Sequence, residues 1–547
     1  MRCVLIAFLF LVGANLEGGE KPNIVYIISD DQTWSDFGFM GNEKVHTPNL
    51  DRLSSQAATF VNGYLPTSVC RPSLVTLMTG LYPHQHGVHF NHGPPGNSGY
   101  NKMTSVSEYL ETREKEFELI REVPTLPRVL AEQFGYRSLQ TGKFWEGHWR
   151  NGGFTEGMTT FEAPPATQTY GGMRKLASGD LVAHGNGDSG LQIGRETMAP
   201  IKEFIVDCEK EETPWLVWYA PYLPHQPHDS PERFYEIAKK QRGVKEHEIP
   251  YFASIAQFDD TVGELIGFVE ANADVKNTIF VFVSDNGWSP SEKRAKSRPV
   301  EFEHTKNSKR APFDEGVRSP ILIRWDGHVK PEIRDDVVSS VDIVATLFDV
   351  TGAKGIELPG RDILNTSLAK KPVFGEIYPG DARQLGKPAR DIAYRWVRDG
   401  DWKLIIPIGG KPWGDYLTDP ALFNVADDSA ENVNRITDVA SAEVVKRLQG
   451  VLDNWWDPAN YYRRVAQNLS AICNATAAAG YDFVPEGKGK VEPVARAIIR
   501  GTTIEDAGSP FDGTYFGTPH IEQEDLKEAL RFLRIEAGML LYDESPN

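Results

Sequence analysis

Three short segments of the chain are apolar at nearly every position rather than at alternating positions. They are residues 23–29, 215–220 and 278–284, and they are rich in β-branched and aromatic side chains. A run of this length and kind is typical of a strand that is buried on both faces of a parallel sheet. Between the runs lie helical patterns such as residues 126–134, which stop at Gly135. Strands that alternate with helices predict an α/β fold with a large, mainly parallel sheet flanked by helices.

The hydrophobic pattern changes near residue 370. Shorter strand-like segments at 392–397 and 402–406 are separated by the turn residues Asp399 and Gly400, which predicts a smaller antiparallel sheet. The expected organisation is a signal segment at 1–14, a catalytic α/β domain at 22–370, a smaller C-terminal α+β subdomain at 371–455, and a C-terminal extension of unassigned role at 456–547.

The first residues have the pattern of an export signal. Arg2 supplies a positive start, residues 3–12 are apolar, and Val12-Gly13-Ala14 is a small-residue cleavage site. A membrane anchor and a buried first helix are the alternatives. Ten apolar residues are too few to span a bilayer, and no later run reaches 18, so we expect no transmembrane anchor. The expected location is periplasmic, extracellular or lysosomal, depending on the source.

Composition and charge narrow the function classes. The 547 residues are 40% hydrophobic and 24% charged, which is ordinary for a globular protein and excludes disorder, collagen and coiled coil. The 58 basic and 76 acidic residues give a net charge of −18. A surface this acidic repels phosphate backbones, so we expect no nucleic-acid partner. A local cationic pocket for an anion remains compatible with this charge.

Polar side chains follow each of the three apolar runs. Asp30 and Asp31 follow the first run, Asp285 and Asn286 follow the third, and His225 comes shortly after the second. In open parallel sheets, ligands bind at the carboxyl ends of the strands. Three carboxylates and one amide oxygen at such an edge suit a hard cation, Ca²⁺ or Mg²⁺. Turn formation alone is the alternative for each pair, but both pairs follow buried strands, which favours a metal site.

Cys70 lies where a helix is expected to begin. Pro72 suits the first helical position and Gly80 suits the end of the helix. A helix N-terminus favours an anion or a thiolate, although a structural buried cysteine is the more common case. After signal cleavage the chain keeps an odd number of cysteines, of which Cys208 and Cys473 could form a pair.

Five motifs follow one another along the chain. They are Cys70-x-Pro72-Ser73 with Thr79-Gly80, Gly142-Lys143, Pro224-His225, Ser284-Asp285-Asn286-Gly287, and Lys309 with the segment 313–320. Taken in order, these motifs resemble those of the type I, formylglycine-dependent sulfatases of the alkaline-phosphatase superfamily. The resemblance covers roughly residues 22–455.

The resemblance implies a mechanism and a set of partners. Cys70 is expected to be oxidised to formylglycine (3-oxoalanine) by a formylglycine-generating enzyme, and a hydroxyl of the hydrated aldehyde attacks the sulfate sulfur. His225 is the expected proton donor to the leaving alcohol, and Lys143 and Lys309 stabilise the anion together with the metal. The implied metal ligands are Asp30, Asp31, Cys70, Asp285 and Asn286, with Ca²⁺ expected and Mg²⁺ as the alternative.

The chain departs from the family pattern at three positions. Leu74 and Leu81 stand where the family has arginines, and Trp145 stands where it has a histidine. Arg71 is a candidate replacement for the first arginine, the alternative being a solvent-facing residue of the first helical turn. His148 is a candidate replacement for the histidine.

The expected substrate is a sulfated carbohydrate or another sulfate ester. Two other functions stay open: a phosphoesterase of the same superfamily, and a non-catalytic relative that binds sulfated glycans. Four histidines follow the Cys70 helix, and they either line the mouth of the pocket or make hydrogen bonds within their loop. They are His84, His86, His89 and His92.

Overall fold

The computed structural model describes residues 21–459, except for 166–169, 293–303, 366–369, 379 and 409–416. The expected signal segment, Cys473 and nearly all of the expected C-terminal extension lie outside the described residues. Contacts divide the chain into two compact units, residues 1–451 and 452–547, and both sheets and the site belong to the first. In the described part of the chain, no helix combines the length and the apolar character needed to cross a membrane.

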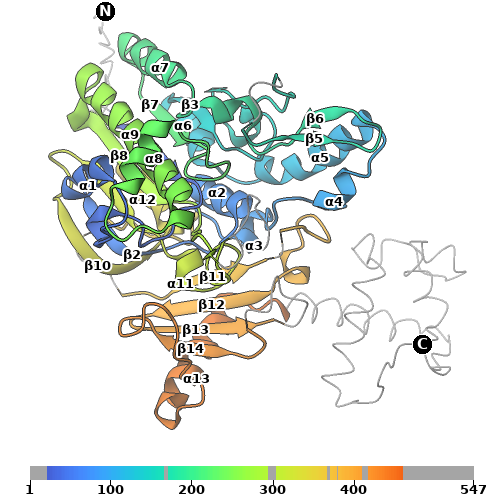
Figure 1. Ribbon diagram of the computed structural model, residues 1–547, viewed down its shortest axis with the longest axis vertical. Helices are drawn as coiled ribbons and strands as arrows, with labels where there is room; N and C mark the ends of the chain where they lie inside the picture. Colours follow the sequence, from blue (N-terminus) through green and yellow to red (C-terminus); the bar gives the residue numbers. More distant parts are fainter. Residues whose placement is uncertain are drawn as a thin grey trace, which may run out of the picture. The chain divides into compact units, whose positions relative to one another are not determined.

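An eight-stranded sheet forms the centre of the first unit (Figure 1). Its order is β10-β2-β9-β8-β1-β7-β3-β4, and every neighbouring pair is parallel except those that include β9. The three apolar runs are β1, β7 and β8, at the bounds expected for them, and they are buried at every position. The predicted fold class is therefore confirmed. The strands are β1 (Asn23–Ser29), β2 (Ala58–Tyr64), β3 (Arg137–Gly142), β4 (Glu156–Gly157), β7 (Trp215–Ala220), β8 (Thr278–Ser284), β9 (Ile321–Trp325) and β10 (Glu332–Ser339).

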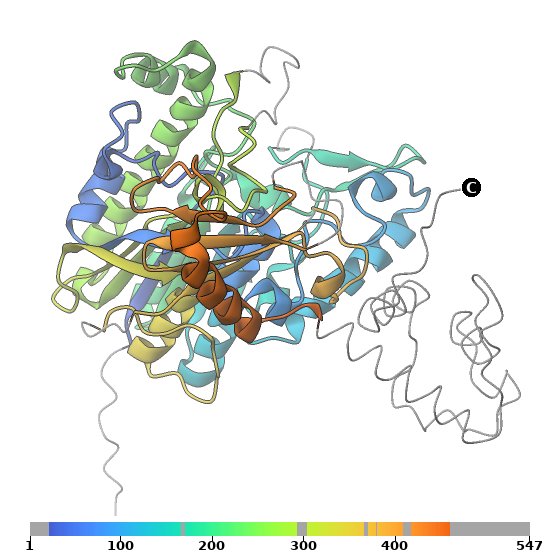
Figure 2. The same ribbon diagram turned by 90° about the horizontal axis from the view of Figure 1, so that it is seen from below.

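Helices cover both faces of this sheet (Figures 1 and 2). Alternate side chains of each strand point to opposite faces, so apolar strands need a helical layer on each side. Ile24 and Tyr26 of β1 pack in the core with α2 (Cys70–Thr79), α6 (Leu126–Phe134) and α12 (Val341–Thr351). Val25 and Ile27 pack on the other face with α1 (Pro48–Ser55), α7 (Ala199–Lys210) and α9 (Ile249–Asn272). Further helices are α3 (Pro83–His86), α4 (Asn97–Tyr100), α5 (Val106–Arg121), α8 (Glu232–Lys239), α11 (Asp314–Val317) and α13 (Ala442–Trp455). A small hairpin pairs β5 (Met173–Lys175) with β6 (Leu181–Ala183).

A four-stranded antiparallel sheet, drawn in orange in Figures 1 and 2, follows the large sheet in sequence. It comprises β11 (Val373–Ile377), β12 (Tyr394–Asp399), β13 (Trp402–Pro407) and β14 (Ala421–Asn424). A buried polar junction joins it to the large sheet. Lys403 Nζ lies 2.8 Å from Asp314 Oδ1, and the Tyr64 hydroxyl donates to Asp314 Oδ2 at 2.7 Å. Since Asp314 opens α11 close to Lys309, this junction also supports one side of the site.

Candidate active site

Cys70 is the first residue of α2, and extended Val69 precedes it. The helix ends at Gly80, whose φ of 69° places it in the left-handed region that favours glycine. The helix starts two residues earlier than Pro72 suggested, because the first-turn N–H groups have no intrahelical partner and proline loses nothing there. Cys70 therefore lies at the helix N-terminus, buried against the sheet edge.

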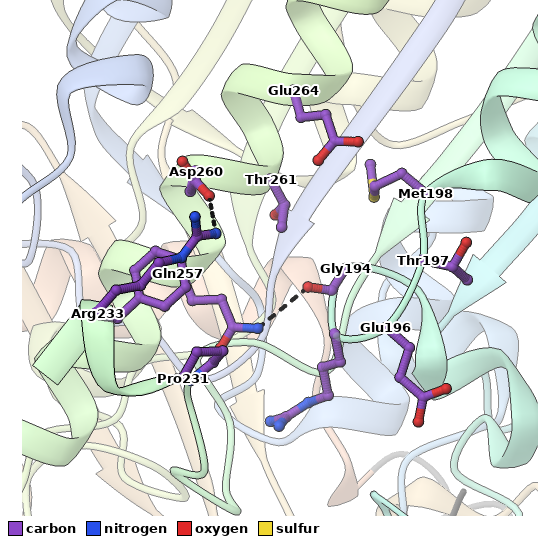
Figure 3. Close-up of a pocket in the computed structure, with 12 residues that line it drawn as sticks. Gly194, Glu196, Thr197, Met198, Pro231, Arg233, Gln257, Asp260, Thr261 and Glu264 are labelled. Carbon is purple, nitrogen blue, oxygen red and sulfur yellow. Dashed lines mark hydrogen bonds and ion pairs between the residues drawn. The ribbon is translucent and has the colours of Figure 1, made fainter.

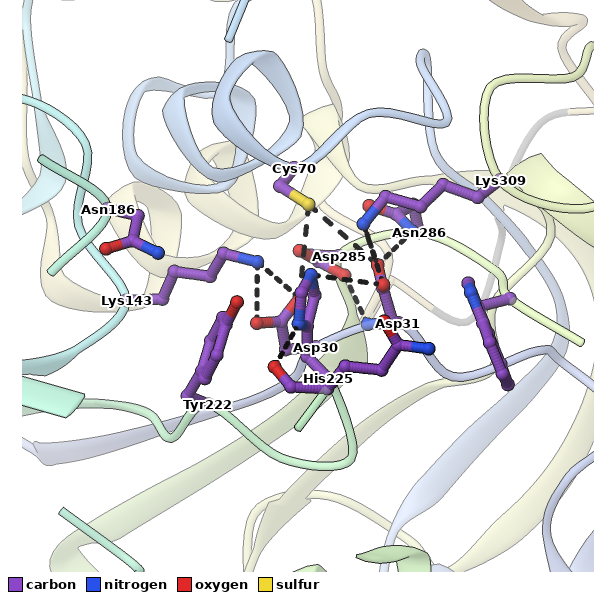
Figure 4. A network of polar contacts seen from close by, with 12 residues as sticks. Asp30, Asp31, Cys70, Lys143, Asn186, Tyr222, His225, Asp285, Asn286 and Lys309 are labelled. Atoms are coloured by element: carbon purple, nitrogen blue, oxygen red, sulfur yellow. Dashed lines mark hydrogen bonds and ion pairs between the residues drawn. The ribbon is translucent and has the colours of Figure 1, made fainter. Parts of the chain in front are cut away.

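The carboxyl ends of β1 and β8 bring the predicted metal ligands together below Cys70 (Figure 4). The Asp31 amide donates to Asp285 Oδ1 at 2.9 Å, and Asn286 Nδ2 donates to Asp31 Oδ1 at 2.7 Å. Cys70 Sγ lies 3.8 Å from Asp31 Oδ1 and 4.0 Å from Asp30 Oδ1. Parallel neighbouring strands end at the same edge, which is why residues 254 positions apart in sequence meet here.

The donor set fits a hard cation. Among the described residues, Asp285 Oδ2 and Asn286 Oδ1 are buried and have no hydrogen-bond partner. Leaving such oxygens unpaired in the interior is costly, so they indicate a ligand. Potential ligand atoms of Asp30, Asp31, Cys70 and His225 lie within 4.8 Å of one another. Oxygen-rich donors of this kind suit Ca²⁺ or Mg²⁺.

Two lysines flank the carboxylates. Lys143 Nζ lies 2.6 Å from both oxygens of Asp30, and Lys309 Nζ lies 2.6 and 2.7 Å from those of Asp31. Gly142 turns the chain at the end of β3 with a φ of 74°, and a Cβ there would lie 1.9 Å from the Ala220 carbonyl oxygen. Burial alone would raise the pKa of Asp31, but the Lys309 ammonium and then His225 hold it below its ordinary value.

His225 is oriented through both ring nitrogens. Nδ1 lies 2.7 Å from the Gln226 carbonyl oxygen, which can only accept, so Nδ1 carries a hydrogen. Nε2 lies 3.4 Å from Asp31 Oδ2 and faces the centre of the site. Burial, assisted by the Lys143 charge, lowers the pKa of His225 well below its ordinary value.

The Cys70 thiol is not a thiolate in this setting. Burial raises its pKa to about 12, although the Lys143 and Lys309 ammonium groups oppose the shift. Burial therefore disfavours the thiolate that a helix N-terminus would favour, since Cys70 is 1% exposed.

Both expectations for Arg71 are wrong. Its side chain is completely buried, and its Nε and Nη2 donate to Glu146 at 2.7 and 2.8 Å. Its Nη1 bonds to Glu116, and the guanidinium lies 4.9 Å from the Phe90 ring centroid. These two carboxylates hold Arg71 as an internal anchor of α2, so it neither faces solvent nor takes over a role in the pocket. Sequence reasoning missed Glu116 and Glu146, since nothing near Arg71 in sequence points to them.

Leu74 also belongs to the interior. It is 4% exposed and packs in the hydrophobic core with Leu77 and Val75 of the same helix. His148 does not replace the missing histidine. Its Nδ1 accepts from the Arg150 amide at 3.2 Å and its ring packs on Trp149, so it caps a short 3₁₀ helix (Trp149–Gly152).

The four histidines after α2 make hydrogen bonds within and beyond their loop. The partners are Glu376 for His84, Thr76 for His86, Asp391 for His89 and Asp381 for His92, at 2.8 to 3.2 Å. Three of these partners are carboxylates that lie in or next to the small sheet. Residues 84–92 therefore link α2, which carries Cys70, to the small sheet.

A separate pocket of about 200 Å³ lies beside residues 194–198 and the helices α8 and α9 (Figure 3). Arg233 pairs with Asp260 at 2.8 Å, and Gln257 Nε2 donates to the Gly194 carbonyl oxygen at 3.4 Å. Its lining does not include the residues that surround Cys70 in the described structure. The candidate active site is therefore distinct from this pocket and lies at the carboxyl ends of β1 and β8.

Comparison with known proteins decides the family. The sulfatase family model matches residues 22–353, more than half of the chain. The chain belongs to the sulfatase family. As a sulfatase it is a sulfuric ester hydrolase, and it has the fold of the alkaline-phosphatase superfamily.

Curated relatives and solved structures agree with this assignment. The chain is 27% identical over 495 residues to arylsulfatase A of Homo sapiens, covering 81% of this chain and 89% of that protein. It is 24% identical to N-acetylgalactosamine-6-sulfatase of Homo sapiens, covering 70% and 73%. The crystal structure of the putative sulfatase yidJ from Bacteroides fragilis shares the fold, with a TM-score of 0.58 at 19% identity, covering 81% of this chain and 97% of that one.

Proposed function

We propose that this sulfatase is exported and removes sulfate from sulfated carbohydrates, using a formylglycine made from Cys70 and a bound divalent cation. The observation that carries the proposal is the position of Cys70 Sγ, 3.8 Å from Asp31, at a helix N-terminus between two buried lysine–aspartate pairs. A relative named for N-acetylgalactosamine 6-sulfate hydrolysis supports a sugar ester as the substrate.

Four side chains would hold the cation, Ca²⁺ or Mg²⁺, together with an oxygen of residue 70. They are Asp30, Asp31, Asp285 and Asn286. The unpartnered oxygens Asp285 Oδ2 and Asn286 Oδ1 support this assignment. When bound, the cation offsets the negative charge of the sulfate ester and lowers the pKa of an oxygen ligand.

Unmodified Cys70 is poorly suited to act as the nucleophile. A thiol with a pKa of about 12 is almost entirely protonated at neutral pH and is a poor nucleophile. Oxidation to formylglycine by a formylglycine-generating enzyme during maturation replaces this thiol with an aldehyde, whose hydrate supplies an oxygen nucleophile.

Three side chains would bind the sulfate ester and protonate the leaving alcohol. Lys143 and Lys309 place two ammonium groups in a dry pocket, where they stabilise an anionic ester more strongly than they would in water. His225 keeps Nδ1–H on the Gln226 carbonyl and points the unprotonated Nε2 into the site, so Nε2 is the atom that would take a proton from the attacking hydroxyl and pass it to the leaving alcohol.

Two measurements on protein from the native host test the proposal. Peptide mass spectrometry across residue 70 should find the aldehyde, and the same preparation should hydrolyse an aryl sulfate and a sulfated monosaccharide. Cys70→Ala should abolish both activities. Cys208→Ala is the matched control, because Cys208 is the other buried free thiol of the described residues and lies on α7, away from the site.

An aryl phosphate separates this proposal from the phosphoesterase alternative. Faster turnover of the phosphate than of the matching sulfate would overturn the choice of substrate. Native protein that carries only unmodified cysteine and has no activity would overturn the formylglycine mechanism.

A further inference from the structure

Close to Cys70, Leu74 offers no hydrogen-bond donor, and Arg71 is held by Glu116 and Glu146. A further donor near Lys143 would therefore help to bind the anionic ester. Tyr222 is a side chain in this place that the mechanism above does not use.

The Tyr222 ring is fixed between two groups of the site. Tyr222 lies just beyond the end of β7, three residues before His225, and is 6% exposed. Its ring stacks on the His225 imidazole with a centroid distance of 4.3 Å and an interplanar angle of 26°. Lys143 Nζ lies 5.1 Å from the same ring centroid (Figure 4).

The Tyr222 hydroxyl is directed into the reaction centre. In the described part of the chain it makes no hydrogen bond, and its oxygen is not among the fully enclosed polar atoms, so a ligand can reach it. Burial raises its pKa, Lys143 opposes the shift, and Asp30, Cys70 and Asp31 add to it. Figure 4 shows the hydroxyl at the end of the ring nearest the Lys143 side chain. With its pKa raised, the hydroxyl keeps its proton at neutral pH and can act as a donor.

We infer that Tyr222 contacts the substrate, donating a hydrogen bond from its hydroxyl to an oxygen of the sulfate group while its ring fixes His225. The inference rests on the proposed function and deepens it. A neutral donor suits this position, because it stabilises a sulfate oxygen without adding a third positive charge beside Lys143 and Lys309.

Two substitutions separate the hydroxyl from the ring. Tyr222→Phe removes only the hydroxyl and keeps the stacking on His225. A lost hydrogen bond to a charged group predicts a decrease in kcat/KM of roughly 10- to 100-fold for aryl and sugar sulfates. Calorimetric titration with inorganic sulfate should show an affinity lower by a similar factor. Tyr222→Leu, which removes the ring as well, should lose at least as much activity.

Tyr219→Phe is the matched control. Tyr219 is also buried, but its hydroxyl donates to Thr261 Oγ1 at 2.6 Å, on the face of the sheet that α9 covers. We expect this variant to lose some thermal stability and to keep both kcat/KM and sulfate affinity.

The outcomes are distinct. A Tyr222→Phe variant with wild-type kcat/KM and sulfate affinity would overturn the inference, and loss of activity in Tyr222→Leu alone would then assign the ring a purely positioning role. If fully modified wild type hydrolyses no sulfate ester, the proposed function fails. In that case the binding measurement alone tests the contact. Weaker binding of inorganic sulfate by Tyr222→Phe than by the wild type would support it, and equal binding would refute it.

Discussion

His225 shows how one residue acquires a role from its two nitrogens. The Gln226 carbonyl fixes the hydrogen on Nδ1, and this leaves Nε2 facing Asp31 in the centre of the site. A histidine held this way can exchange a proton at one defined atom. Its contribution should depend on how strongly the departing alcohol needs that proton.

His225→Ala should therefore slow sugar sulfates much more than activated aryl sulfates. An activated phenolate leaves without help, whereas a sugar alkoxide does not, and general-acid assistance is typically worth about 10²–10⁴-fold. Steady-state kcat on both substrate types measures the difference. His148→Ala, which changes a histidine outside the site, should leave both rates at the wild-type level. Equal losses on the two substrates in His225→Ala would instead indicate a role in binding.

Asp285 has one oxygen bonded to the Asp31 amide and one oxygen without a partner. Asp285→Asn keeps the size of the side chain and one acceptor oxygen but removes the negative charge. We therefore expect it to lower the metal content and to reduce turnover by roughly tenfold or more. Elemental analysis of the purified variant gives the metal content. Asp36→Asn, at a buried carboxylate bonded to the Tyr251 hydroxyl, is the control and should retain the metal. Full metal content in Asp285→Asn would remove Asp285 from the ligand set.

At the scale of elements, α2 is held by an internal ion-pair network. Arg71, in its first turn, binds Glu146 from the segment after β3 and Glu116 from α5, and all three side chains are buried. Removing one partner of a buried pair leaves an uncompensated charge, which costs far more than breaking a surface pair. The network thus fixes the start of the helix, where Cys70 lies.

Glu146→Gln should lower the free energy of unfolding by about 3 kcal/mol, the range seen when a buried ion pair is broken. Glu156→Gln, which breaks a partly exposed pair with Arg137, should cost less than about 1 kcal/mol. Urea unfolding of both variants checks the contrast. Equal, small losses would mean that Arg71 is adequately paired by Glu116 alone.

At the scale of the whole first unit, the small sheet is joined to the large one through Lys403. Its ammonium group lies 2.8 Å from Asp314 and 3.0 Å from Glu431, and all three side chains are buried. Burial raises the pKa of Glu431 to about 7, so much of the negative charge at the junction rests on Asp314, whose pKa Lys403 lowers against the effect of burial.

Lys403→Met should destabilise the protein by about 3–5 kcal/mol, because Asp314 is left buried without its main counter-charge. The double variant Lys403→Met/Asp314→Leu removes both charges and should recover part of that loss. Denaturation midpoints of the two variants give the comparison. A double variant that is less stable than Lys403→Met would show that Asp314 stabilises the junction mainly through its bond with Tyr64.

The sequence by itself determined the large sheet and much of the candidate site. Continuous apolar runs are recognisable because a strand buried on both faces must be apolar throughout, and Asp30, Asp31, Asp285 and Asn286 follow such runs directly. Lys143, His225 and Lys309 were identified through the family resemblance, and the roles of all these residues stay predictions. Only the tertiary structure decided the partners of Arg71, the interior position of Leu74, the contacts of the four histidines and the place of Tyr222. Arg71 meets Glu146 across 75 residues and His84 meets Glu376 across 292. Such contacts depend on how distant segments pack, and local pattern carries no record of them.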